Sequence, residues 1–134
     1  MSTYEGGCLC GAVRYRAVGE ASDSTLCHCR SCRRASGAPL VAWVTFPRAG
    51  VTFTGAEPVR YRSSPPVVRT FCGRCGTPIT YAHDSEPETL DVTTASLDRA
   101  DACPPKDHIW TSDSLAWVFD TDSLPKHAEK RGRS

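Results

Sequence analysis

Apolar and polar residues alternate along much of this chain with the period of a β-strand. Val13, Tyr15 and Ala17 alternate with two arginines, the pattern of a strand with one buried face. Residues 40–46 are rich in β-branched and aromatic side chains and end at Pro47, as in a deeply buried strand. Further strands are expected at residues 51–54, 59–62, 67–71, 79–82, 89–95, 109–111 and 116–119. Short strands separated by glycine and proline predict a mainly β fold.

Residues 30–35 form the one segment in which we expect a helix, and Gly37 would end it. Residues three positions apart are neighbours on a helix. Cys29 and Cys32 would therefore face the same side, an arrangement suited to two ligands of one metal ion.

Seven of the eight cysteines fall into three tight groups. The groups are Cys8 and Cys10; Cys27, Cys29 and Cys32; and Cys72 and Cys75. Four thiolates complete a tetrahedral structural zinc site, whereas three thiolates leave one position open for chemistry. We therefore interpret the two pairs as ligands of one structural zinc and the triplet as ligands of a second zinc with an open position.

Each cysteine pair is followed by a glycine, Gly11 in one case and Gly76 in the other. Glycine permits the backbone conformations of tight turns. Such turns would direct backbone N–H groups at the thiolate sulfurs and stabilise their charge.

Other assignments of the cysteines stay open from the residues alone. Two triplet cysteines could join a pair, or Cys103, His28 or His108 could close the triplet. An iron–sulfur cluster is a further alternative, although this triplet spacing matches none of the common cluster motifs. Disulfides are less favoured, because clustered cysteines in a reducing compartment are typical of metal or catalytic sites.

Several single residues are given structural roles. We expect His28 to point away from the metal, Cys103 to be a free thiol and His83 to lie at the surface. His108 could face the site or cap a strand. The three tryptophans, Trp43, Trp110 and Trp117, are expected in the core.

Composition narrows the range of functions. The chain has 134 residues, 40% hydrophobic and 23% charged, which is ordinary for one globular domain. A formal net charge of +1 argues against nucleic acid as the main partner. No apolar run reaches the length of a membrane span.

The two ends of the chain suggest its location and its boundaries. The first seven residues lack the apolar and basic regions of a secretory signal, so a cytoplasmic location is expected. Residues 126–134 are polar and basic and are expected to form a disordered tail. Residues 1–125 would then be a single zinc-binding domain.

The order of the cysteine motifs resembles the glutathione-dependent formaldehyde-activating family, which shares its domain with centromere protein V. The resemblance rests on residues 7–11 (GCLCG), 27–33 (CHCRSCR) and 71–76 (FCGRCG), together with the segment from Pro105 through Trp117 to Pro125. It covers about residues 5–125. Several such motifs in one order are far more specific than one CxxC alone.

The family resemblance implies a β-tent fold, in which antiparallel sheets meet around a structural zinc. It assigns Cys8, Cys10, Cys72 and Cys75 to that zinc and Cys27, Cys29 and Cys32 to a second, catalytic zinc. The implied activity is that of a carbon–sulfur lyase that joins glutathione, or a related small thiol, to an aldehyde such as formaldehyde. The arginines that would bind the carboxylates of glutathione are Arg30, Arg33, Arg34 and Arg74.

Two other functions remain as alternatives. A non-catalytic zinc module that binds protein or nucleic acid would have a closed second site and a basic surface. A thiol carrier or redox protein would use the triplet as reversible thiols without metal.

Overall fold

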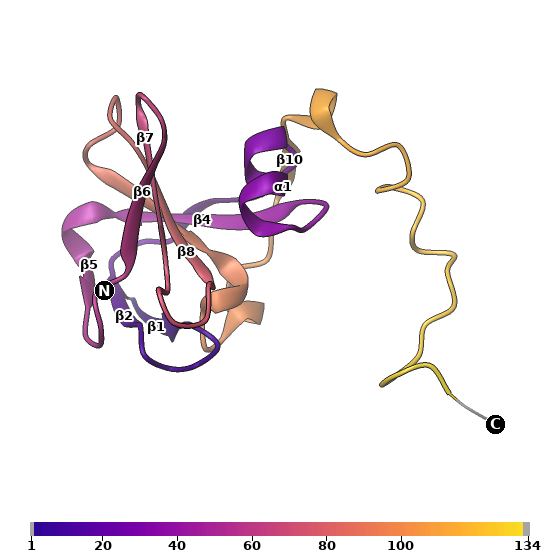
Figure 1. Cartoon of the computed structure of the whole chain (residues 1–134), viewed down its shortest axis with the longest axis horizontal. Helices are drawn as coiled ribbons and strands as arrows, with labels where there is room; N and C mark the ends of the chain where they lie inside the picture. The colour runs from indigo at the N-terminus through magenta and orange to yellow at the C-terminus, as the bar shows by residue number, and fades with distance from the viewer. Residues whose placement is uncertain (1, 133–134) are drawn as a thin grey trace.

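Two β-sheets account for most of the regular structure in residues 2–132, the part of the chain that the computed structural model describes (Figure 1). The smaller sheet has the order β1-β2-β5, with β1 at Thr3–Gly7, β2 at Arg14–Val18 and β5 at Val51–Phe53. The larger sheet has the order β10-β3-β4-β9-β8-β7-β6. Its strands are β10 (Asp107–Ile109), β3 (Ser22–Cys27), β4 (Val41–Pro47), β9 (Thr89–Thr93), β8 (Pro78–His83), β7 (Val67–Phe71) and β6 (Val59–Ser64).

Neighbouring strands pair antiparallel, except that β10 runs parallel to β3 at the sheet edge. The predicted mainly β fold is therefore confirmed. Short 3-10 helices occupy several connections: η1 (Arg48–Gly50), η2 (Thr94–Ser96), η3 (Ala100–Ala102) and η4 (Thr111–Asp113). Within residues 2–132, no helix has the length and apolar character needed to cross a membrane.

The predicted short helix is α1, Arg30–Ser36. Cys29 caps its N-terminus, because the Cys29 sulfur accepts a hydrogen bond from the Cys32 backbone N–H at 3.2 Å. Gly37 ends the helix in the left-handed conformation, with φ at 69°, which a glycine adopts without steric cost.

The core lies where the two sheets face each other. Tyr15 and Ala17 from β2 pack with Val44 and Phe46 from β4, and all four side chains are fully buried. The Tyr15 hydroxyl reaches Ser96 at 2.8 Å, so the polar end of this buried ring is satisfied. The alternation read from the sequence thus places every second residue of β2 in the core.

Some sequence predictions were wrong. The sequence pattern missed β1 and β3, and the strand expected at residues 109–111 lies at Asp107–Ile109. Residues 116–119 form turns rather than a strand, because no neighbouring strand supplies hydrogen bonds to them. Trp43 is buried as expected, but Trp110 and Trp117 are 61% and 55% exposed.

The segment after η4 extends to one side of the two sheets (Figure 1), although the Phe119 ring still packs on His28 and His108. Residues 126–132 are exposed and hold no helix or strand. The disorder expected for residues 126–134 stays a prediction, as do the domain boundaries. Met1 and residues 133–134 lie outside the described residues.

Candidate metal sites

The four-cysteine cluster joins the two sheets. Cys8 and Cys10 lie in the connection between β1 and β2 of the smaller sheet, and Cys72 and Cys75 lie between β7 and β8 of the larger sheet. Their four sulfur atoms all lie within 4.8 Å of one another. The Cys8 and Cys10 sulfurs are 3.6 Å apart, and Cys10 is 3.8 Å from Cys72. This set of donors fits a closed tetrahedral metal site.

Tight turns aim backbone N–H groups at these sulfurs, as expected from the glycines. The N–H of Val13 donates to the Cys8 sulfur at 3.2 Å, and those of Arg74 and Cys75 donate to the Cys72 sulfur at 3.3 and 3.4 Å. Gly11 and Gly76 both have a φ of +82°, which L residues rarely adopt.

Thr77 ties the two turns of the four-cysteine cluster together. Its hydroxyl accepts a hydrogen bond from the Leu9 backbone N–H at 3.1 Å and lies 3.2 Å from the Cys75 sulfur. The hydrogen bond from Thr77 is the largest influence that lowers the pKa of Cys75, to about 5. A low thiol pKa favours the thiolate that binds a metal.

The three-cysteine cluster lies at the junction of β3 and α1. Cys27 ends β3, Cys29 caps the helix and Cys32 lies in its first turn. The three sulfurs lie within 4.8 Å of one another, and no fourth Cys, His, Asp or Glu of residues 2–132 joins this set. The residues fit a metal site with one position left for an outside ligand.

Hydrogen bonding distributes the protons of the triplet unevenly. The Cys27 thiol, followed by Cys29 and the charge of Arg69, lowers the pKa of Cys32 to about 5, although burial acts in the opposite direction. The same contact with Cys32 raises the pKa of Cys27. These contacts and the Arg69 charge favour the thiolate form at Cys32 over Cys27.

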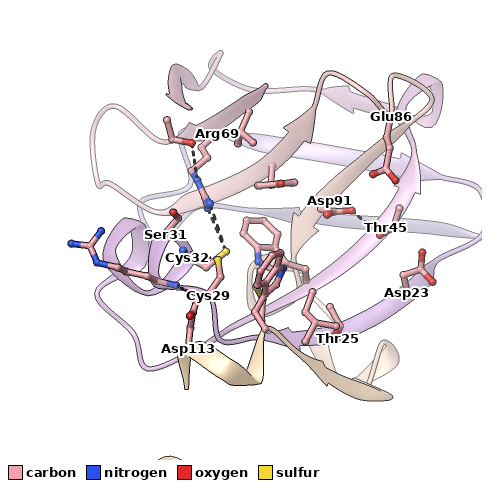
Figure 2. Close-up of a pocket in the computed structure, with 18 of the residues that line it drawn as sticks. Asp23, Thr25, Cys29, Ser31, Cys32, Thr45, Arg69, Glu86, Asp91 and Asp113 are labelled. Atoms are coloured by element: carbon pink, nitrogen blue, oxygen red, sulfur yellow. Dashed lines mark hydrogen bonds between the residues drawn. The ribbon is translucent and has the colours of Figure 1, made fainter. Parts of the chain in front are cut away.

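Two cavities meet at Cys32. The larger measures about 720 Å³ and is lined by all three triplet cysteines. Figure 2 shows Cys29 and Cys32 in its wall. The smaller measures about 600 Å³ and lies between α1, β6 and β7. Residues that line both cavities include Arg30, Cys32, Trp43 and Arg69. Outside molecules therefore have room beside the triplet.

The charged groups of the larger cavity are mostly acidic. They are Asp23, Glu86, Asp91, Asp107 and Asp113, together with Arg30 and Arg69. Burial raises the pKa of Asp91, whose carboxylate accepts a hydrogen bond from the Thr45 hydroxyl at 2.6 Å. The cavity can therefore receive a molecule that carries both positive and negative groups.

Arg69 is a site residue that the sequence reasoning missed. Its guanidinium nitrogens lie 3.6 and 3.7 Å from the Cys32 sulfur (Figure 2). The sequence feature that could have identified Arg69 is its charge, which interrupts the largely apolar strand expected at residues 67–71. Only the fold shows that this arginine, from β7, faces the triplet.

The four arginines singled out from the sequence occupy different places. Arg30 lines both cavities and Arg34 lines the smaller one. Arg33 and Arg74 line neither cavity. Arg74 lies between Cys72 and Cys75, in a turn of the four-cysteine cluster.

His28 and Cys103 stay outside both sulfur clusters. His28 is fully buried, and its Nε2 lies 2.9 Å from Nδ1 of His108, while the ring of Phe119 stacks on it at 5.2 Å. The Nδ1 atom of His28 is buried and has no hydrogen-bond partner in the described chain. Cys103 is buried in the main core.

Together, the fold and the two sulfur clusters define a small β protein that can hold two metal ions through cysteines. One cluster is complete, and the other opens into a cavity.

Comparison with known proteins places this protein in a family. The model of the glutathione-dependent formaldehyde-activating enzyme family matches residues 3–113, and the chain belongs to this family. An uncharacterized lyase of Schizosaccharomyces pombe is 34% identical over 83 residues, which cover 62% of this chain and 60% of that protein. The chain thus matches less than two thirds of the length of this relative.

A solved structure shares the fold. The crystal structure of a Rhodobacter sphaeroides protein aligns with a TM-score of 0.61 and 25% identity. The alignment covers 78% of this chain and 98% of that chain.

Proposed function

We propose that this protein is a zinc-dependent carbon–sulfur lyase-type enzyme that acts on an adduct of glutathione or a related small thiol, such as S-hydroxymethylglutathione formed from formaldehyde. The observation that carries the proposal is the three-cysteine cluster, which opens into a cavity and gains no fourth protein ligand from residues 2–132. Membership of the family supports glutathione and formaldehyde as the substrates.

In this proposal Cys27, Cys29 and Cys32 hold the catalytic zinc, and Cys8, Cys10, Cys72 and Cys75 hold the structural zinc. A zinc ion bound to the triplet would lower the pKa of an incoming thiol. The thiol gives up its proton and its sulfur bonds to the carbonyl carbon of formaldehyde. The electron pair of the C=O π bond moves to oxygen, and the oxygen takes up one proton in place of the one that the thiol released. Lyase action is the reverse of these changes.

The charges around the triplet suit the other groups of glutathione. Arg30 and Arg34 present guanidinium groups that can bind its carboxylates. Asp91 and Asp113 in the larger cavity offer partners to its ammonium group. Holding the thiol and the aldehyde in the right geometry would lower the barrier to addition through proximity.

We further propose a cytoplasmic location, because a reducing compartment keeps such clustered thiols free for metal. The seven cysteines of the two clusters are free thiols and form no disulfides, and their sulfurs are grouped closely enough to bind metal. We do not propose nucleic acid as a partner, because the net charge is near neutral and nucleic-acid-binding domains are usually strongly basic.

Cobalt substitution tests this function. The metal content of the freshly purified protein is measured first, and two ions per chain are expected. Cobalt is then placed in the triplet site, and its visible spectrum is followed as glutathione is added. We expect a spectral change that saturates with glutathione. We also expect the metal-loaded protein to accelerate the exchange between glutathione and its formaldehyde adduct, and proton NMR measures the rate of this exchange.

The variant Cys29→Ser is the matched control, since it removes one triplet ligand and leaves the four-cysteine cluster intact. It should lose both responses. A cobalt spectrum unmoved by any small thiol would contradict the proposal and favour a closed binding module. A metal-free triplet that cycles to a disulfide would favour a redox protein.

A further inference from the structure

Arg69 brings a positive charge to one sulfur of the open cluster. Its Nη1 and Nη2 atoms approach the Cys32 sulfur at 3.6 and 3.7 Å, so both arms of the guanidinium face the same atom. Within residues 2–132, none of the ion pairs includes Arg69. Its charge is therefore directed at sulfur rather than offset by a carboxylate.

The fold fixes the position of this guanidinium. Arg69 lies at the centre of β7 and pairs with Tyr81 on β8. Its guanidinium carbon lies 5.1 Å from the centre of the Tyr81 ring, a cation–π distance. Its Nε donates to the Ser63 hydroxyl at 3.2 Å. Three separate contacts thus hold a side chain that would otherwise be free to rotate.

The charge of the triplet explains why such a group is useful. Three thiolates around a divalent ion leave one net negative charge, and a thiolate from the substrate adds a second. Each added negative charge is costly in a partly buried site unless a positive group lies close by. A neutral fourth ligand, such as imidazole, adds no charge and needs no such compensation.

We propose that Arg69 is a positioning residue that makes the triplet selective for a thiolate as its outside ligand. It holds Cys32 in place and compensates the charge that accumulates when the substrate sulfur arrives. This inference rests on the proposed function, because it requires a metal in the triplet. It adds a residue that discriminates between anionic and neutral ligands at that metal.

Ligand binding to the cobalt-loaded protein tests the inference without an activity assay. The probes are 2-mercaptoethanol, which becomes an anion at its sulfur and has no carboxylate for an arginine to bind, and imidazole, which is neutral. Both are titrated against the visible spectrum of wild type, Arg69→Met and Arg69→Lys. Arg62→Met is the matched control, because Arg62 lies on the neighbouring strand β6 and pairs with Asp84.

For Arg69→Met we expect the affinity for 2-mercaptoethanol to fall at least about tenfold, because a close charge is lost. Imidazole affinity should stay within about twofold. Arg69→Lys should recover part of the loss, since a lysine keeps the charge without the planar fork, and Arg62→Met should match wild type.

Equal thiol affinity in wild type and Arg69→Met would overturn this inference and leave the proposed function standing. An equal loss for both probes would also overturn it, because that result marks a general distortion of the site. A wild-type protein that takes up only one cobalt per chain would overturn the proposed function and this inference together.

Discussion

The two cysteine clusters use the same ligand atom but differ in what surrounds it. The four-cysteine cluster lies between the two sheets, its set of sulfurs is complete, and none of its cysteines lines either cavity. The three-cysteine cluster lies at the end of one strand and the start of a short helix, beside both cavities. Ligand number and access, rather than ligand type, separate a cluster that joins elements from one that can bind a substrate.

The elements that carry the clusters differ in the same way. The two turns of the four-cysteine cluster belong to different sheets, so a metal there would link segments more than sixty residues apart in the sequence. All three triplet cysteines come from one continuous segment, residues 27–32. Removing the first metal should therefore affect folding, and removing the second should affect chemistry.

The largest expected effect is on stability and comes from Cys72→Ser. Metal binding at such a site is coupled to folding and carries about 10 kcal/mol of apparent free energy. We expect the variant to lose more than about 5 kcal/mol, most of the stability of a domain of this size. Thermal unfolding followed by circular dichroism should show no cooperative transition near that of wild type.

Cys103→Ala is the control for this experiment, because Cys103 is buried but belongs to neither cluster. It should cost no more than about 1–2 kcal/mol, the typical effect of a small change in a core, and should keep two metal ions per chain. If Cys72→Ser were as stable as Cys103→Ala, the four-cysteine cluster would not be needed for folding, and the proposed difference between the two clusters would be wrong.

The second effect is on chemistry and comes from Cys29→Ser. This change removes a triplet ligand together with the sulfur that caps α1, and a serine hydroxyl can still cap the helix. We expect the rate of adduct formation to fall at least about a hundredfold. The melting temperature should stay close to that of wild type. Loss of cooperative folding would show that the triplet is structural as well.

A third, smaller effect is on glutathione binding, and it should differ between an arginine beside the triplet and one beside the four-cysteine cluster. Arg30 lines both cavities beside the triplet, whereas Arg74 lines neither. Arg30→Ala should raise the KM for glutathione at least about tenfold, the value of one charge-assisted hydrogen bond. Arg74→Ala should leave that KM unchanged. Steady-state kinetics with glutathione as the varied substrate measures both, and equal effects would refute this assignment.

The smallest expected effect is on stability and comes from the partly buried carboxylate of Asp91, which lines the larger cavity beside the triplet. Burial raises the pKa of Asp91 above its unfolded value, so the ionised carboxylate opposes folding at neutral pH. Asp91→Asn should therefore stabilise the protein at neutral pH by less than about 1 kcal/mol. The gain should shrink as the pH falls through the raised pKa, where wild-type Asp91 becomes protonated.

Urea denaturation of both proteins across this pH range measures the difference directly. A destabilised variant at neutral pH would mean that the hydrogen bond from Thr45 outweighs the cost of burying the charge.

Strong local patterns were predicted well. The strand expected at residues 67–71 is β7 with the same bounds, and the helix expected at residues 30–35 is α1 with one further residue. The polar segment Ser22–Cys27 was missed because it becomes a strand only through pairing with β4 and β10. Neighbouring strands override a weak local preference in such cases.

The sequence by itself determined the local geometry of the ligands. The close spacing of the cysteines, together with Gly11, Gly37 and Gly76, sets two turns and the short helix that gather sulfurs a few residues apart. These features depend on backbone conformations within a handful of residues, and such conformations follow from residue type.

Only the tertiary structure decided what lies across from each group of ligands. It brought Cys72 within 3.8 Å of Cys10 and placed Arg69 against Cys32, residues separated by 62 and 37 positions. It also left Trp110 exposed and opened two cavities at the triplet. Contacts of this kind depend on how sheets pair and pack, which no short stretch of sequence encodes.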